Sequence, residues 1–198
     1  MMPTTLWMRH GTCRDGLRRP TAHAQPSSPL TAQGAVEARR AASALRERRW
    51  QPALVVPSPL RRARQTAAIL SRELDAPLAE PVTTFTEWQA PPCVHRMTPS
   101  QYPPEYLAWR RQRGGHPDST LPGGESLRSF ANRAMTAAET ACRMSRKHGA
   151  VLVVSHRLLI GAVAAVHAGH RQPAEIFEYA RTFSILPARL WPVSEEQP

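Results

Sequence analysis

The first residues of the chain that suit chemistry are Arg9 and His10, which follow an apolar run and precede Gly11. An apolar run such as 6–8 that ends in a turn signal is typical of a buried strand. Gly11 lets the chain leave that strand sharply and lets a ligand approach the backbone. Arginine carries a permanent planar charge that suits phosphate, and histidine is a nucleophile or an acid near neutral pH. The pair indicates an anion site at a strand end, with an ordinary surface Arg-His pair as the alternative.

A second segment places more cations behind an apolar run. Residues 53–56 form a predicted strand, after which Ser58 and Pro59 predict a helix start with the serine as N-cap. Arg61 and Arg62 then fall in the first helical turn, where two cations oppose the helix dipole unless an anion joins them. The alternative is that both side chains extend into water, which we expect for one of the two.

The clearest predicted strand, 151–154, ends in a second histidine, His156, and leads into an apolar helix from 158 to about 167. Parallel strands bring their carboxyl ends to one edge of a sheet, so we expect four side chains to converge there: Arg9, His10, Arg62 and His156. This set suits phosphoryl transfer, in which a neutral imidazole attacks phosphorus while fixed cations stabilise the oxygens. The guanidinium groups would make a metal ion unnecessary.

The remaining pattern predicts one α/β domain over residues 1–198. Predicted elements outside the site are a loop at 14–30, helices at 31–49, 103–113 and 126–148, a weak strand at 82–85, a last strand from 182 to 186 or as far as 190, and a polar tail from 192. The irregular insertion at about 88–124 contains many prolines and few apolar residues. It is too small to hold a core of its own, so we expect it to form a cap over the site.

The composition excludes several other classes of protein. The net charge is +11, but the 25 arginines and one lysine are scattered, and no basic block with interleaved aromatic residues predicts a nucleic-acid partner. Three cysteines far apart indicate neither a disulfide framework nor a zinc site, and three aspartates are few for a magnesium site. The apolar stretch 151–169 contains His156 and Arg157, which argues against a membrane partner. We expect a cytoplasmic protein.

The ordered motifs resemble those of the histidine phosphatase superfamily, also called phosphoglycerate-mutase-like. Arg9-His10-Gly11 matches its Arg-His-Gly signature, and residues 58–67 match its Ser-x-Leu-x-Arg-Ala-x-x-Thr-Ala helix start. Further matching segments are Pro29-Leu30-Thr31 with Gly34, Gly123-Gly124-Glu125-Ser126 and Val153-Val154-Ser155-His156. The resemblance spans about residues 5–187. It implies a three-layer α/β/α sandwich with a mostly parallel sheet flanked by helices.

The resemblance also implies roles for the matched residues. His10 is the nucleophile that forms a phosphohistidine, and His156 is the second catalytic histidine. Arg9 and Arg62 bind the phosphoryl group together with His156. No metal ion and no cofactor are implied.

Other assignments are less direct because the chain departs from the family pattern. Glu87 falls where the larger branch has a general acid, but the residues that usually follow are missing, so Glu105 is an alternative. Thr12 and Arg157 are candidate substrate contacts that replace the residues more common in the family. Gly16 stands where many members carry an asparagine, which puts one phosphate contact in doubt. Arg157 has the alternative of an ordinary surface arginine.

The implied function is a metal-independent phosphomonoesterase that acts on a small phosphorylated metabolite. The alternatives are a phosphoglycerate mutase and a catalytically silent member that only binds phosphoryl groups. The chain is short for a mutase, which must retain the leaving alcohol. The absence of a G-x-S-x-G motif argues against a serine hydrolase. Neither the substrate nor the oligomeric state can be predicted.

Overall fold

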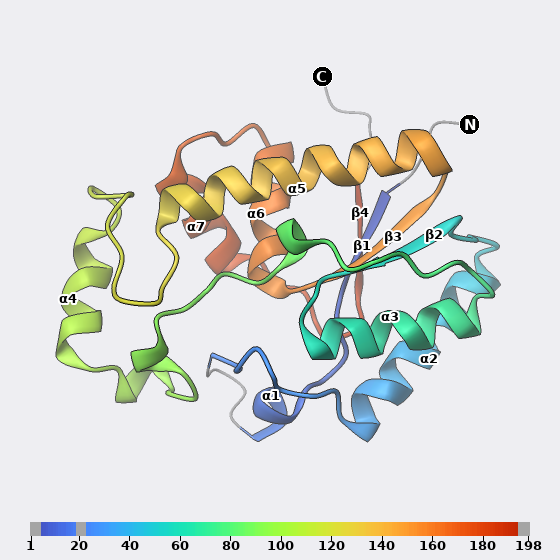
Figure 1. The fold of residues 1–198 in the computed structure, drawn as a ribbon, viewed down its shortest axis with the longest axis horizontal. Helices are drawn as coiled ribbons and strands as arrows, with labels where there is room; N and C mark the ends of the chain where they lie inside the picture. Colours follow the sequence, from blue (N-terminus) through green and yellow to red (C-terminus); the bar gives the residue numbers. More distant parts are fainter. Residues whose placement is uncertain (1–4, 19–22, 194–198) are drawn as a thin grey trace.

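A computed structural model describes residues 5–18 and 23–193, and these form one sheet between two layers of helices (Figure 1). The strands described are β1 (Thr5–Arg9), β2 (Leu54–Pro57), β3 (Val151–Ser155) and β4 (Leu190–Val193). Their order is β2-β3-β1-β4, with β1, β2 and β3 parallel and β4 antiparallel to β1. The prediction of an α/β sandwich with a mostly parallel sheet is confirmed.

Both faces of the sheet are covered, so each strand is apolar on both sides. The side chains of Leu6 and Leu152 pack in a cluster with α2 (Ala32–Glu47) and α3 (Arg61–Glu73). Those of Trp7 and Val153 pack on the opposite face, which is covered by three further helices: α5 (Leu127–His148), α6 (Arg157–His167) and α7 (Pro173–Thr182). In Figure 1 the long α5 and the pair α2–α3 lie on opposite sides of the strands.

The predicted ends of two helices are confirmed. The backbone N–H of Gly34 donates to the Thr31 hydroxyl at 3.0 Å and caps α2. Ser126 caps α5 in the same way, and Gly149 ends α5 with a φ of 94°, a conformation that favours glycine. These short-range signals act within one helical turn, which is why the sequence predicts them well.

The predicted helix start at Ser58-Pro59 is wrong. Helix α3 begins at Arg61 with Leu60 as N-cap, and no side chain caps it. The hydroxyl of Ser58 accepts the backbone N–H of Leu60 at 3.3 Å and contacts His156 instead. A contact with a residue distant in the sequence replaces the expected local cap.

Two predicted strands are also wrong. Thr83–Phe85 is a short 3-10 helix (η1), because Phe85 packs edge-on against Trp7 at 5.2 Å between ring centroids rather than adding to the sheet. Residue 182 ends α7, in which the buried residues recur with helical spacing: Pro173, Ile176, Phe177 and Ala180. The last strand is β4, whose Pro192 is tolerated because β4 lies at an edge of the sheet.

The remaining segments lie around the carboxyl edge of the sheet. The predicted loop at 14–30 contains the short helix α1 (Arg14–Arg18), and part of that prediction concerns residues outside the described chain. The segment 88–124 contains α4 (Pro104–Gln112) and two 3-10 helices, η2 (Pro92–Val94) and η3 (Pro99–Gln101). The helix predicted at 103–113 is confirmed as α4. It stands at one end of the molecule, away from the strands (Figure 1).

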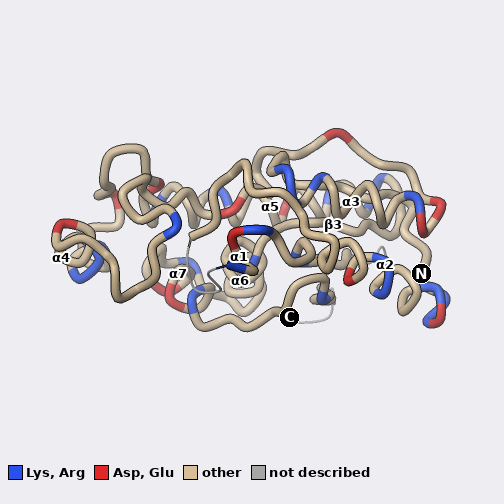
Figure 2. Tube along the Cα trace, turned by 90° about the horizontal axis from the view of Figure 1, so that it is seen from below, with Lys and Arg blue, Asp and Glu red and all other residues tan. Residues whose placement is uncertain are grey.

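The described residues contain no helix long and apolar enough to cross a membrane. The predicted polar tail from 192 begins inside β4, and its remainder, 194–198, lies outside the described residues. Basic residues occur along the whole length of the molecule in Figure 2 instead of gathering on one element. Within the part of the chain that the structure describes, the basic positions are thus spread over several elements.

Candidate active site

The parallel pairing of β1 with β3 brings the two histidines together. Arg9 lies opposite Ser155 in the register, so His10 and His156 each follow one member of that pair. The centroids of their imidazole rings are 5.1 Å apart. Arg62, in the first turn of α3, reaches the same place because β2 pairs with β3. The structure therefore brings together all four residues expected to converge.

A cavity of about 700 Å³ opens beside these residues. We call the lining made by Arg9, His10, Cys13 and Arg62 the inner part of the cavity. We call the lining from the loops and the helices α6 and α7 the outer part, and it includes His23, Trp88, His95, Arg157 and Arg181. His156 is fully buried and lies next to the inner part, because its ring neighbours that of His10. The volume is that of a site for a small organic ligand.

The imidazole of His10 is held with one nitrogen ready to act as a nucleophile. Nδ1 lies 2.7 Å from the carbonyl oxygen of Gly11, so Nδ1 carries the hydrogen and donates it. Nε2 accepts a hydrogen bond from Nε of Arg62 at 3.1 Å, which requires a lone pair on Nε2. Burial lowers the pKa of His10 well below its usual range, Arg62 adds to this, and the Gly11 carbonyl opposes it. The ring is therefore neutral at pH 7.

The loop that carries His10 is fixed by a close approach of two glycines. A Cβ on Gly11 would lie 2.5 Å from the carbonyl oxygen of Gly34, and one on Gly34 would lie 2.3 Å from that of Thr12. The backbone N–H of Gly11 also donates to the hydroxyl of Thr66 at 3.2 Å. The start of α2 and the middle of α3 thus set the position of the loop that carries His10.

Both arginines are oriented by backbone carbonyl groups. Nη1 of Arg9 donates to Ile185 O at 2.9 Å, and Nη1 of Arg62 donates to Gln25 O at 3.0 Å. Burial lowers the pKa of both guanidinium groups, and the nearby Glu87 opposes this. Nε of Arg9 is buried without a hydrogen-bond partner among the described residues. Two oriented cations beside a neutral imidazole form a site for a dianion.

Glu87 lines the same cavity, and its carboxylate lies at the N-terminus of α6. Its carboxylate accepts the backbone N–H groups of Leu158 at 3.2 Å, Leu159 at 3.1 Å and Trp88 at 3.0 Å. A carboxylate at a helix N-terminus is favourable because it satisfies amide groups that have no partner within the helix. Glu87 therefore reaches the cavity while also capping α6.

A salt bridge holds the segment that carries Glu87. Nη2 of Arg133 lies 2.6 Å from Oε2 of Glu125, and the same guanidinium donates to the carbonyl oxygens of Thr84 and Glu87 at 3.2 and 3.3 Å. Glu125 belongs to the Gly-Gly-Glu-Ser motif, so this motif helps to orient the segment, and its first residue, Gly123, also lines the cavity. Sequence reasoning missed Arg133, because nothing near it in the sequence signals the contact.

Comparison with known proteins agrees with this geometry. The model of the histidine phosphatase superfamily (branch 1) matches residues 6–182. The chain belongs to this superfamily. A probable phosphoglycerate mutase of Proteus mirabilis is 29% identical over 178 residues, which are 82% of this chain and 73% of that protein. The predicted family is therefore confirmed.

Solved structures share the fold of this superfamily member. The alpha-ribazole phosphatase of Shigella flexneri has a TM-score of 0.77 at 20% identity, with 98% of this chain and 91% of that one covered. A mycobacterial glucosyl-3-phosphoglycerate phosphatase has a TM-score of 0.73 at 23% identity, with 97% and 91% covered. At these identities the likeness establishes the fold.

Among the other candidates for a role in this superfamily member, Glu105 and Thr12 are not brought to the cavity. Glu105 is exposed on α4 and is not among the residues that line the cavity. The backbone N–H and the hydroxyl of Thr12 both donate to the carboxylate of Glu37, at 2.7 and 2.8 Å. The structure thus shows Thr12 tying the His10 loop to α2.

Arg157 lines the cavity, but its guanidinium group is held by the backbone. Its Nη1 donates to the carbonyl oxygens of Ala180, Arg181 and Phe183, at 3.4, 3.2 and 3.3 Å. These carbonyls belong to the end of α7, where a cation is favourable. Gly16, where many members have asparagine, lines the cavity with no side chain to bind phosphate.

Sequence reasoning also missed two histidines of the outer cavity. His23 and His95 line it from separate irregular segments, and His23 stacks on Tyr102 with 6.1 Å between centroids. Burial lowers the pKa of His23 to about 4, and the neighbouring His95 and Arg157 contribute. No motif predicts such residues, because irregular segments lack hydrophobic periodicity.

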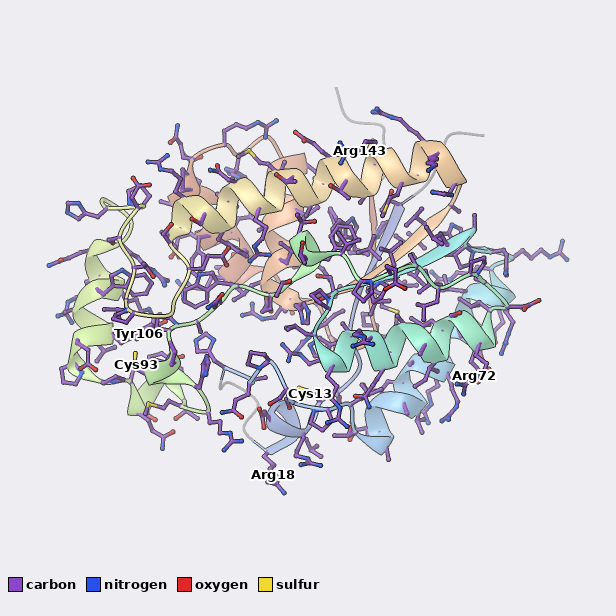
Figure 3. All side chains as sticks on the ribbon, viewed as in Figure 1. Cys13, Arg18, Arg72, Cys93, Tyr106 and Arg143 are labelled. Carbon is purple, nitrogen blue, oxygen red and sulfur yellow. The ribbon has the colours of Figure 1, made fainter. Side chains whose placement is uncertain are left out.

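The described residues contain no cluster of three or more His, Cys, Asp or Glu side chains that could hold a metal ion. No disulfide bond joins Cys13, Cys93 and Cys142, all of which lie in the described part of the chain. Figure 3 shows Cys13 below the strands and Cys93 beside Tyr106 in the segment near α4. Cys13 is buried and lines the inner cavity.

Proposed function

We propose that the protein is a phosphomonoesterase that hydrolyses a small phosphorylated metabolite through a phosphohistidine at Nε2 of His10. The observation that carries this proposal is the pair of hydrogen bonds on His10. The carbonyl group of Gly11 fixes the hydrogen on Nδ1. The hydrogen bond from Nε of Arg62, 3.1 Å long, requires a lone pair on Nε2. A nucleophile and a cation for the attacked group thus lie side by side.

The reaction proceeds in two displacements at phosphorus. Nε2 of His10 forms a bond to phosphorus as the ester P–O bond breaks, and the leaving oxygen takes a proton, which we assign to Glu87. Water then attacks phosphorus and gives a proton to the Glu87 carboxylate as the N–P bond breaks, which releases inorganic phosphate and restores neutral His10 and protonated Glu87. Arg9 and Arg62 balance the charge on the phosphoryl oxygens in both steps, so the proposed reaction needs no metal ion.

The similarities support a phosphatase and also favour a second candidate. Two solved structures of the same fold are those of proteins named as phosphatases. The relative from Proteus mirabilis is named a probable phosphoglycerate mutase, which favours transfer of the phosphoryl group back to the leaving alcohol as the alternative. Hydrolysis is our first choice, because Gly16 supplies no side-chain contact to hold the intermediate or alcohol.

A panel of phosphorylated metabolites, incubated with the protein and a chelator, tests the proposal by release of inorganic phosphate. We expect phosphate from one or more esters, a ³²P-labelled and acid-labile protein after rapid quenching, and neither product in His10→Gln. An isomerised phosphoester in place of free phosphate would support the mutase. No labelled protein and no product from any ester would indicate a member that only binds phosphoryl groups.

A further inference from the structure

Ser58 contacts the second histidine of the site across 98 residues of sequence. Its hydroxyl oxygen lies 2.8 Å from Nε2 of His156, and both side chains are fully buried. The sequence motif that contains Ser58 suggests a helix cap, but α3 begins three residues later, without a side-chain cap. The hydroxyl is therefore available to act on His156.

The hydrogen bonds of Ser58 decide which nitrogen of His156 carries the hydrogen. The Ser58 oxygen already accepts the backbone N–H of Leu60 at 3.3 Å. Among residues 5–18 and 23–193, Nε2 of His156 is the acceptor that the structure offers to the hydroxyl hydrogen. If Nε2 held the hydrogen instead, the buried hydroxyl hydrogen and the Nδ1 lone pair would both lack partners, at a cost in free energy.

We infer that Ser58 is a positioning residue: its hydroxyl donates to Nε2 of His156 and so keeps the imidazole hydrogen on Nδ1, which donates to a phosphoryl oxygen. Nδ1 of His156 is buried and has no hydrogen-bond partner in the described part of the chain. The inference rests on the proposed function, because it needs a phosphoryl group beside the two imidazoles.

The two histidines then have the same tautomer but present opposite nitrogens. His10 directs its Nδ1–H to a carbonyl and presents a lone pair, while His156 directs its lone pair to Ser58 and presents an N–H. The titratable and charged groups that act on His156 are Arg62, His10, Arg133 and Arg9. All of them, together with burial, keep the pKa of His156 well below its usual range, so the neutral tautomer matters at pH 7.

The kinetic test compares kcat/KM of the wild type, Ser58→Ala and Ser58→Thr at pH 7, where His156 is neutral. We expect Ser58→Ala to lose about tenfold, the scale of one buried hydrogen bond. Ser58→Thr, which keeps the hydroxyl, should recover most of the activity.

Ser145→Ala is the matched control, since Ser145 is a fully buried serine of α5 whose hydroxyl has no partner among the described residues. We expect it to match the wild type. Equal losses in Ser58→Ala and Ser58→Thr would overturn the positioning role and leave only a packing role, because Ser58→Thr keeps the hydroxyl. Phosphate release by the wild type would still support the proposed function.

Long-range ¹H–¹⁵N NMR on the histidines of the wild-type protein gives a reading that needs neither turnover nor a variant of Ser58. The signals of His156 are assigned by their loss in His156→Gln. We expect the hydrogen on Nδ1, and a hydrogen on Nε2 at neutral pH would contradict the inference. Failure to release phosphate from any ester would instead contradict the proposed function.

Discussion

The two ends of the cavity are built in different ways. At the inner end, Arg9, His10 and His156 lie at or just after strand ends, and Arg62 lies in the first turn of α3. At the outer end, the lining comes mainly from irregular segments, such as 23–26 and 86–95. Under the proposed function, strand ends and α3 hold the groups that would meet the phosphoryl group, whereas irregular segments hold Glu87 and the groups that would meet the rest of the substrate. We therefore expect phosphoryl binding and selectivity to be separable by mutation.

The largest expected effect comes from removing a cation of the inner part of the cavity. Arg62→Ala should lower kcat/KM by about 10³-fold, the scale of losing a preorganised charge beside the reacting group. The loss should be similar for every ester, because Arg62 acts on the phosphoryl group and on His10. Inorganic phosphate release from several esters measures it. Arg61→Ala, which alters the exposed neighbour in the same helical turn, should stay within about twofold of wild type.

The second effect depends on the leaving group. Glu87→Gln should slow hydrolysis of alkyl phosphates about 10²-fold, the scale of general acid catalysis. It should slow p-nitrophenyl phosphate much less, since that leaving group needs no proton. Parallel assays with both esters measure the difference, and Glu105→Gln on the exposed α4 serves as the control. Equal losses on both esters would remove Glu87 from the role of acid.

The third effect concerns stability at the outer end. The pKa of His23 is lowered from 6.5 to about 4 in the folded protein. Between these values the unfolded chain binds a proton that the folded protein does not, so stability falls as the pH falls. His23→Gln should recover about 2 kcal/mol of this loss at pH 5.

Urea unfolding of both proteins at pH 7 and pH 5 measures this recovery. His10 and His156, whose pKa values are also lowered, remain in both and add the same acid loss to each. His116→Gln changes an exposed histidine near α4 and is the control. An equal acid loss in wild type and His23→Gln would show that the outer end contributes no buried neutral imidazole.

The smallest expected effect tests whether Thr12 stabilises the fold or contacts the substrate. Thr12→Val removes the hydroxyl that donates to Glu37 and leaves the cavity lining unchanged. We expect a loss of about 1 kcal/mol in the free energy of unfolding, with KM unchanged. Urea unfolding and steady-state kinetics measure the two quantities. A raised KM with unchanged stability would return Thr12 to the substrate site.

The contrast between regular elements and irregular segments also explains how much of the fold and of the site the sequence could predict. Strand ends and helix caps are set by neighbouring residues, so the sequence alone suffices to place Arg62 and His156 at one sheet edge. It does not suffice for the partner of Ser58, because Ser-Pro is a valid helix start and the contact spans 98 residues. Likewise, Arg133 acts on residues 46 to 49 positions away. Such contacts follow from the assembled fold and leave no local pattern.

The hydrogen bond from Arg62 to Nε2 of His10 has a chemical consequence. Under the proposed function, the lone pair that would attack phosphorus is already engaged, so a substrate would have to offer its own oxygen to the guanidinium before Nε2 is released. A phosphate dianion can make this exchange, whereas a small uncharged electrophile has no anionic oxygen to replace Nε2 as the hydrogen-bond acceptor. The same arginine would therefore admit phosphate esters and shield Nε2 of His10 from adventitious alkylation or acylation.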